Sequence, residues 1–207
     1  MGARPFGWTL HAMTITAALA LLAAVSACPP GHVLPVIVTV EAEPPTVAST
    51  YRLDELRAMA RQVGHVKTHP VLGFYAATFG YRLEISADGD CPSGTVIRLM
   101  LGARHVEVPS DAKAWGCRPE ALAEHYLLHA EADIATLGQL ARQVQAAVDR
   151  LPGRPDQAPS ASPLASAVDE LLPAYDADRL KAFAASEAGS AASHLRDACR
   201  GGMPGSL

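Results

Sequence analysis

The longest regular pattern of apolar positions in the chain lies between residues 119 and 150. Apolar side chains recur there every three or four residues, which is the spacing of one face of an α-helix. Pro119 and Glu120 suit the first turn of such a helix, and Pro152 stands beyond its end. The pattern predicts one long core helix with a buried face made of Leu122, Tyr126, Ala130, Ile134, Leu137, Leu140, Ala141, Val144 and Val148.

The region before this helix is rich in aromatic and β-branched residues and predicts three strands, at about residues 74–86, 95–101 and 104–108. The sequence Gly-Ala-Arg between the last two is short enough for a hairpin. One face of the middle strand is more apolar than the other and is expected to cover the long helix. That face carries Ile97, Leu99 and Leu101.

Two further elements are predicted on the N-terminal side of these strands. Residues 51–64 place apolar side chains on one face, with Asp54 and Glu55 early and Gly64 as a stop, which predicts a short amphipathic helix. Residues 36–42 form a valine-rich run after a proline, so they are either an edge strand or an extended tether within residues 28–50.

The C-terminal part of the chain has a weaker pattern. Residues 154–163 are a linker rich in Pro, Ser and Ala, and residues 164–207 predict two or three weak helices with a disordered end. This tail either packs back on the main domain or folds marginally. Its residues able to dock are Leu164, Val168, Leu171, Leu172, Leu180, Phe183 and Leu195.

These elements together predict an α+β fold. Its main domain, residues 51–153, consists of a small antiparallel β-hairpin sheet of about three strands packed on one long α-helix. The short amphipathic helix precedes this sheet and the helical tail follows the domain. A chain of 207 residues with 49% hydrophobic residues can bury one core of this kind. The formal net charge is −4 and no stripe of Lys or Arg is present, which argues against nucleic acid as a partner.

The N-terminus has the layout of a secretory signal. Arg4 precedes the apolar run 15–25, which is too short to span a bilayer, and small residues follow before Cys28. The sequence predicts an exported protein with a signal peptide at residues 1–27. Cleavage before Cys28 would release a soluble protein in the ordinary way.

The residues Val-Ser-Ala-Cys at 25–28 also resemble the lipobox of bacterial lipoproteins. This resemblance implies lipidation of Cys28 and a lipid anchor that holds the protein to a membrane of the cell envelope.

Three cysteines follow Cys28, and an exported chain lives where disulfides persist. Cys91 precedes the second predicted strand and Cys117 precedes the long helix. We expect a disulfide between these two, with unpaired thiols as the alternative. The role of Cys199 stays open.

Two pairs of histidines have a spacing of four residues. His65 and His69 lie between Gly64 and Pro70, which favours loop histidines. His125 and His129 lie on the long helix, with Asp133 four residues further along the same stripe.

The imidazoles of His125 and His129 can converge on a divalent metal, and zinc accepts such ligands. Asp133 is too far along the axis to bind the ion held by His125, so we expect it to orient His129 from outside the ligand shell. The alternative is a pair of polar or packed helix residues without an ion.

A hairpin, an upstream Cys and a helix with His125 and His129 resemble the core of the zincin metallopeptidases, whose signature helix reads H-E-x-x-H. The resemblance spans at most residues 74–150. In that family the Glu after the first His is the general base, whereas this chain has Tyr126. A phenol with an ordinary pKa of about 10 is a poor base at neutral pH.

The resemblance therefore implies a zincin-like domain that has lost its catalytic residue. The corresponding function is a non-catalytic binding or scaffolding module of the cell envelope, with an envelope protein as partner and a divalent metal, zinc, as a possible ligand. Two alternatives remain open. The first is an active metal-dependent hydrolase that uses Glu124 or Glu131, and the second is a purely structural envelope protein without metal.

Overall fold

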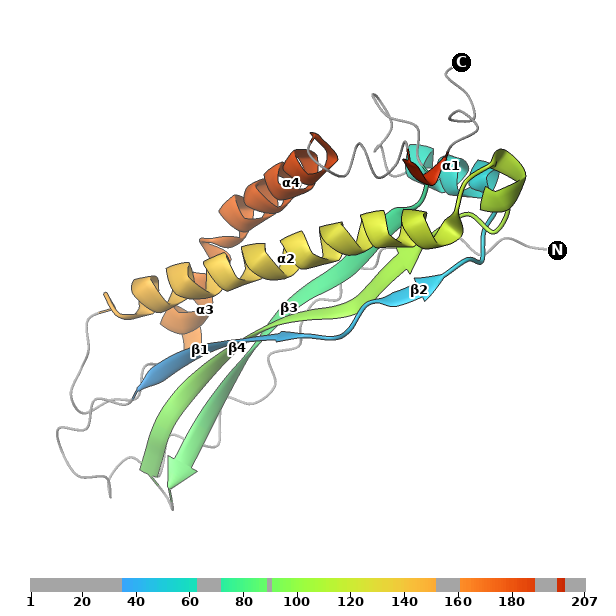
Figure 1. Cartoon of the computed structure of the whole chain (residues 1–207). Coiled ribbons are helices and arrows are strands. Elements are labelled where there is room, and N and C mark those ends of the chain that lie inside the picture. The colour runs from blue at the N-terminus through green and yellow to red at the C-terminus, as the bar shows by residue number, and fades with distance from the viewer. Residues whose placement is uncertain (1–34, 63–71, 89–90, 152–160, 189–196, 200–207) are drawn as a thin grey trace.

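The fold is a narrow mixed sheet with its helices gathered on one face (Figure 1). The computed structural model describes residues 35–62, 72–88, 91–151, 161–188 and 197–199. Among these residues, no helix is long and apolar enough to cross a membrane. The signal peptide, Cys28 and the pair His65 and His69 lie outside the described residues, and their interpretation stays a prediction.

The sheet is built around one long strand, β4 (Cys91–Glu107). Strand β3 (Phe74–Asp88) pairs with β4 in antiparallel orientation along its whole length. Strands β1 (Val36–Ala42) and β2 (Thr46–Ala48) pair with β4 in parallel, one after the other. They form the opposite edge of the sheet (Figure 1). The mixed α and β composition is confirmed, but the expected purely antiparallel sheet is wrong. For residues 36–42, the structure supports the edge strand and not the tether.

The predicted hairpin at Gly-Ala-Arg is also wrong. β4 continues through residues 102–104, and the register to β3 shifts between Ala76 and Thr78. Ala103 has a positive φ of 48°, and its N–H donates to Glu43 Oε2 at 3.0 Å. Thr78 pairs with Gly102 and Ala76 with His105, so Ala103 and Arg104 together face Ala77 and make a β-bulge, which bends a strand without ending it.

The helices follow the predicted periodicity closely. Helix α1 covers Leu53–Gln62 and helix α2 covers Pro119–Val148. A short 3-10 helix, η2 (Ala112–Trp115), stands between β4 and α2. Helices α3 (Ala161–Asp169) and α4 (Leu172–Ala188) form the described part of the tail, and α3 begins inside the expected linker.

α2 lies along one face of the sheet and α4 lies beside α2 (Figure 1). The apolar face of β4 covers α2 as expected, since Ile97, Leu99 and Leu101 are all buried. The opposite face of the sheet is polar. There Arg98 forms salt bridges with Glu41 and Glu84, one on each neighbouring strand.

Two apolar clusters make up the core. The first joins α1, the end of β4 and the first turns of α2, and its large members include Leu53, Val106, Leu122 and Tyr126. The second joins the middle of β4 to the second half of α2 and to α3 and α4, with Leu99, Leu137, Leu164, Val168 and Tyr175 among its members. The tail therefore packs on the main domain, as one of the two alternatives predicted. Among the expected docking residues that the structure describes, Leu180 is the exception, because it is 61% exposed, and Leu195 lies outside the described residues.

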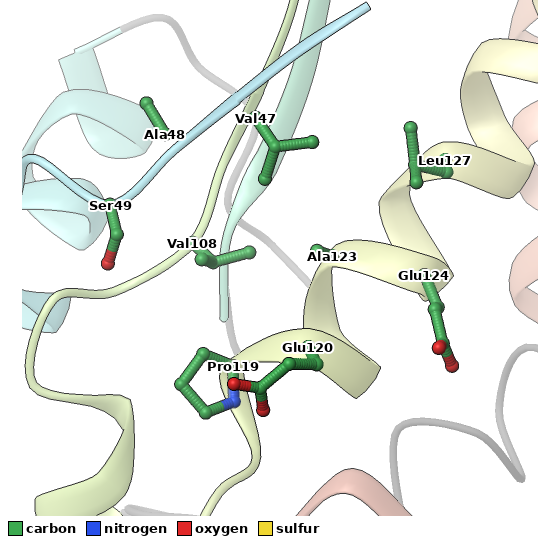
Figure 2. Close-up of a pocket in the computed structure, with 9 residues that line it drawn as sticks. All are labelled: Val47, Ala48, Ser49, Val108, Pro119, Glu120, Ala123, Glu124 and Leu127. Carbon is green, nitrogen blue, oxygen red and sulfur yellow. The ribbon is translucent and has the colours of Figure 1, made fainter.

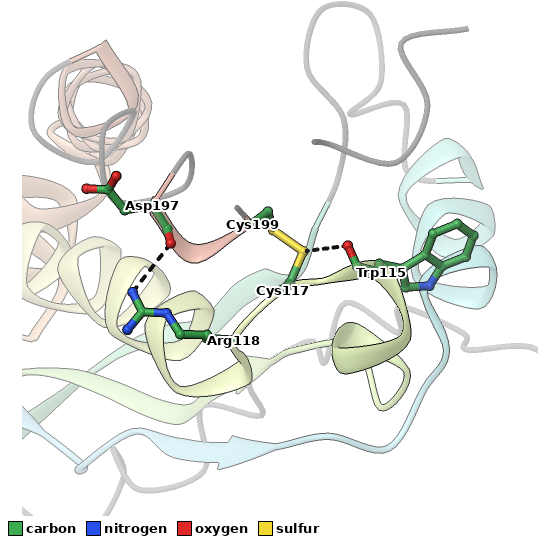
Figure 3. Close-up of a disulfide and its surroundings, with 5 residues drawn as sticks. All are labelled: Trp115, Cys117, Arg118, Asp197 and Cys199. Carbon is green, nitrogen blue, oxygen red and sulfur yellow. Dashed lines mark hydrogen bonds between the residues drawn. A yellow bond between two sulfur atoms is a disulfide. The ribbon is translucent and has the colours of Figure 1, made fainter. Parts of the chain in front are cut away.

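The disulfide joins different cysteines from those expected. Cys117 pairs with Cys199, 82 residues away in the sequence, and not with Cys91 (Figure 3). The C-terminal segment is further held by a hydrogen bond of 2.8 Å from Arg118 N–H to the carbonyl of Ala198. This bond and the disulfide attach the end of the described chain to the start of α2.

Candidate functional site

α2 brings His125 and His129 side by side, as the sequence predicted, but it places them inside the protein. His125 is fully buried and His129 is 6% exposed. Their ring centroids are 5.1 Å apart and the rings are almost perpendicular. The Tyr126 ring lies 4.9 Å from the ring of His125. The three rings form one buried aromatic group at the N-terminal half of α2.

α4 closes this group from the side. The ring of Phe183 lies 5.2 Å from the ring of His129, and Ser186 Oγ lies 2.9 Å from His129 Nδ1. A hydrogen bond at Nδ1 fixes the orientation of the imidazole and directs Nε2 to the other side of the ring. The residue that orients His129 in the described part of the chain is therefore a serine on α4.

Asp133 has a different role from the one predicted. It is fully buried and accepts two hydrogen bonds from Arg179, from Nε at 2.5 Å and from Nη2 at 2.8 Å. The hydroxyl of Tyr75 donates to Asp133 Oδ2 at 2.9 Å. The sequence could not show this arrangement, because Arg179 and Tyr75 come from α4 and β3. Asp133 is thus a structural ion-pair partner that joins three elements.

Arg104 extends this polar group toward the sheet. It is 4% exposed, and it donates to Tyr75 Oη at 3.2 Å and to the carbonyl of Ala130 at 2.7 Å.

The charge of Asp133 also affects the pKa values of Tyr175 and Arg179 on α4. Burial, and to a smaller extent the charge of Asp133, raise the pKa of Tyr175. Burial disfavours the charged guanidinium of Arg179, but the hydrogen bonds and charge of Asp133 outweigh this effect and raise its pKa. Both shifts keep the groups in the protonation states that the network uses.

Tyr126, which the resemblance to zincins would place at the general-base position, is a core residue in the structure. It is 8% exposed and belongs to the first apolar cluster. Its ring lies so close to Gly73 that a Cβ there would come within 2.4 Å of Tyr126 Cε2. The interpretation of Tyr126 as a packing residue is therefore confirmed.

The two substitute bases suggested by the sequence lie on the outer side of α2. Glu124 and Glu131 are both exposed, whereas His125 and His129 are buried. Glu124 lines a groove of about 420 Å³ between β2 and the first turns of α2 (Figure 2). The groove is otherwise mainly apolar, with walls from Val47, Val108, Ala123 and Leu127.

A second polar group, which the sequence analysis missed, lies on the far face of the sheet. His105 Nε2 is 2.8 Å from Glu107 Oε2, and His105 Nδ1 is 3.1 Å from Thr46 Oγ1. The Glu107 carboxylate is only 1% exposed and accepts hydrogen bonds from the backbone N–H groups of Thr50 and Tyr51. The spacing of His105 and Glu107 in a predicted strand could have shown that they share a face. Their contacts with residues 46–51 could not be predicted in the same way, because these contacts depend on the parallel pairing of β2 with β4.

The donor atoms near α2 fit a metal only in part. A catalytic zinc site has three protein ligands. Within the described ranges, no group of three or more His, Cys, Asp or Glu side chains could hold a metal ion. His125 and His129 supply two imidazoles, and Asp133 is taken by Arg179.

Comparison with protein-family models, with curated proteins and with solved structures finds no match to this chain.

Proposed function

We propose that this protein is a non-catalytic binding or scaffolding module of the cell envelope, held to a membrane by a lipid at Cys28. The observation that carries the proposal is the position of Tyr126. A zincin needs a carboxylate there to activate water, and this chain has a phenol packed against Gly73 in the core.

The surroundings of the histidines support the same proposal. Peptide hydrolysis requires a site that substrate can enter, whereas His125 is fully buried and His129 is covered by α4 through Phe183 and Ser186. The contacts of the His129 ring stabilise the packing of α4 on α2. In the described part of the chain, the groove beside β2 offers an open surface to a partner.

A divalent metal at His125 and His129 is the part of the proposal that tests the resemblance to zincins. The hydrogen bond at His129 Nδ1 favours it. Ser186 Oγ donates its own proton to the carbonyl of Phe183 and therefore accepts from Nδ1–H, which leaves the ring lone pair on Nε2, as in ligating histidines. In this role a metal would fix the two imidazole rings on α2 and would not activate water.

Metal analysis of the purified protein tests this part. The wild type is compared with His125→Ala plus His129→Ala, and the melting temperature of the wild type is measured with zinc and with a chelator. Zinc that is bound by the wild type, lost in the variant and stabilising on addition supports a metal. A wild type that contains no zinc and shows no shift with either additive overturns it without relying on the variant.

Peptide cleavage tests the non-catalytic claim. We expect no hydrolysis of denatured casein by the zinc-supplemented wild type. Cleavage that disappears in Glu124→Gln or in Glu131→Gln would overturn the proposal in favour of a hydrolase. The variant Tyr126→Glu restores the family residue. Its gain of cleavage would show a zincin-like centre that lacks only its base.

A further inference from the structure

Strands β1 and β2 form one edge of the sheet, and they differ in whether a side chain bonds to their outward-pointing backbone groups. At β1, the Gln145 side chain on α2 takes the place of a neighbouring strand. Val38 N–H donates to Gln145 Oε1 at 3.0 Å, and Gln145 Nε2 donates to the carbonyl of Val36 at 3.0 Å. An edge satisfied in this way cannot pair with another chain.

At β2 the same edge is open. The carbonyl of Ala48 accepts a hydrogen bond from Val108 N–H at 3.0 Å, so the backbone groups of Ala48 point toward β4. Backbone groups alternate along an edge strand, and therefore the N–H and C=O of Val47 point away from the sheet. Among the residues that the structure describes, no side chain bonds to β2 as Gln145 bonds to β1.

The groove lies directly beside this open edge. Figure 2 shows Val47 and Val108 on one side and Ala123 and Leu127 on the other. Val47 is 51% exposed and lines the groove, so its side chain is accessible to a partner. Two acidic residues of α2, Glu120 and Glu124, also line the groove, and no basic residue of the described ranges does.

We propose that β2 and this groove bind an extended segment of a partner protein that carries apolar residues and Lys or Arg on the same face. The segment adds as a strand beside β2, where its backbone bonds to the N–H and C=O of Val47. Side chains on one face of a strand are two residues apart, so an apolar residue of that face enters the groove and the next residue of the same face, a Lys or Arg, reaches Glu120 and Glu124. This inference rests on the proposed function and names the chemistry of the partner.

The charge of the groove decides between this partner and other occupants. A second copy of the chain would bring its own Glu120 and Glu124 close to those of the first, and like charges repel. An anionic lipid surface would be repelled for the same reason. An extended segment with basic and apolar residues can bond to the backbone of Val47, pack against the apolar walls of the groove and pair with the carboxylates of Glu120 and Glu124.

A synthetic peptide tests the proposal directly. The probe is a fluorescein-labelled Thr-Val-Thr-Lys-Thr-Val-Thr-Lys, whose Val and Lys side chains share one strand face, added to the purified full chain and followed by fluorescence anisotropy. A matched peptide with Glu in place of Lys should bind at least about tenfold more weakly, because like charges at an interface cost more than 1 kcal/mol. Equal binding of the two peptides would overturn the charge complementarity.

Backbone methylation separates strand addition from simple burial of side chains. The same probe with N-methyl valines keeps its charges and apolar groups but cannot donate to the carbonyl of Val47. We expect its binding to fall by about fivefold, since the lost hydrogen bond is worth roughly 1 kcal/mol. Unchanged binding would overturn the β-strand mode.

Variants of the protein locate the site. Val47→Asp should abolish binding, and Glu120→Gln plus Glu124→Gln should weaken it by roughly threefold to tenfold. All three positions line the groove, and Glu131→Gln is the matched control on the exposed side of the same helix. Equal loss in the control, or none in the groove variants, would place the peptide elsewhere.

Mass spectrometry of the recovered probe separates this inference from the proposed function. An intact, bound peptide supports both. A cleaved peptide overturns the non-catalytic function while binding at β2 stands. A peptide that is intact and unbound overturns the inference, and the non-catalytic function then stands on its own tests.

Discussion

Gly73 and Asp133 illustrate how single residues set the interior around α2. Gly73 leaves the space that the Tyr126 ring fills, so its missing side chain places the tyrosine in the core. Asp133 is the one carboxylate that faces both Tyr75 and Arg179. Neither role follows from spacing in the sequence, because each depends on a partner from another element.

Replacement of Gly73 by alanine should be strongly destabilising. The new Cβ would lie 2.4 Å from Tyr126 Cε2 and 2.7 Å from the carbonyl oxygen of Glu107, and neither a packed ring nor backbone moves easily. We expect the free energy of unfolding in urea to fall by about 2 kcal/mol. Gly80→Ala is the control, because its nearest neighbour is the flexible end of Met100 at 3.8 Å. Equal midpoints for the two variants would contradict this packing.

Replacement of Asp133 by asparagine should leave the Arg179 guanidinium without its counter-charge. Since Asp133 is fully buried and accepts both hydrogen bonds of Arg179, we expect a loss of about 3 kcal/mol in unfolding free energy. Asp178→Asn removes an exposed ion pair with Lys181 and should cost less than about 0.5 kcal/mol. Urea denaturation of both proteins measures the difference, and similar losses would argue against the buried network.

At the scale of elements, α2 performs three tasks along its length. Its first turns line the groove, its middle carries the histidines and Asp133, and its second half covers the sheet and protects the edge of β1. A helix of 30 residues can do this because its faces contact different elements at successive positions along the helix axis. Ile134, which the periodicity placed in the core, is 39% exposed, while Asp133 beside it is buried.

Gln145→Ala tests the protection of β1. The variant loses the bonds to Val38 N–H and to the carbonyl of Val36, so we expect a decrease of about 1–2 kcal/mol in unfolding free energy. It should also aggregate faster at equal concentration, because the edge becomes open to other chains. Gln139→Ala on the exposed side of α2 is the matched control. Light scattering and urea denaturation together decide the outcome, and a variant that behaves like the control would contradict the edge protection.

On the scale of the whole molecule, a polar layer divides the core. Arg104 on β4 and Asp133 on α2 lie between the two apolar clusters, and Arg179 brings α4 to the same layer. The far end of the chain is attached separately, through Cys117 and Cys199 at the start of α2 (Figure 3). The tail is therefore held to the domain at two places.

Loss of the disulfide should weaken this attachment. In the chain-entropy model, a loop of 82 residues makes the bond worth about 4 kcal/mol. We expect Cys117→Ala plus Cys199→Ala to unfold at clearly lower urea concentration than the wild type, and α4 to be cut earlier in limited proteolysis. A variant with unchanged midpoint and unchanged cleavage order would show that packing on α2 alone holds the tail.

The sequence by itself determined the elements whose evidence is local. Helix periodicity placed α1 and α2, alternation selected the buried face of β4, and spacing put His125 and His129 side by side. These properties depend on residues that are close in the chain.

Only the tertiary structure decided which distant segments meet. The parallel pairing of β1 and β2 with β4, the partner of Cys117 and the role of Asp133 all join residues more than 40 positions apart. The same distinction explains the bulge at residues 103–104. The preceding Gly102 suits a turn, but the pairing of β4 with β3 continues on both sides of the bulge and keeps the chain in one strand. Local patterns carry little information on such contacts, because the free energy of each one depends on the packing of the whole fold.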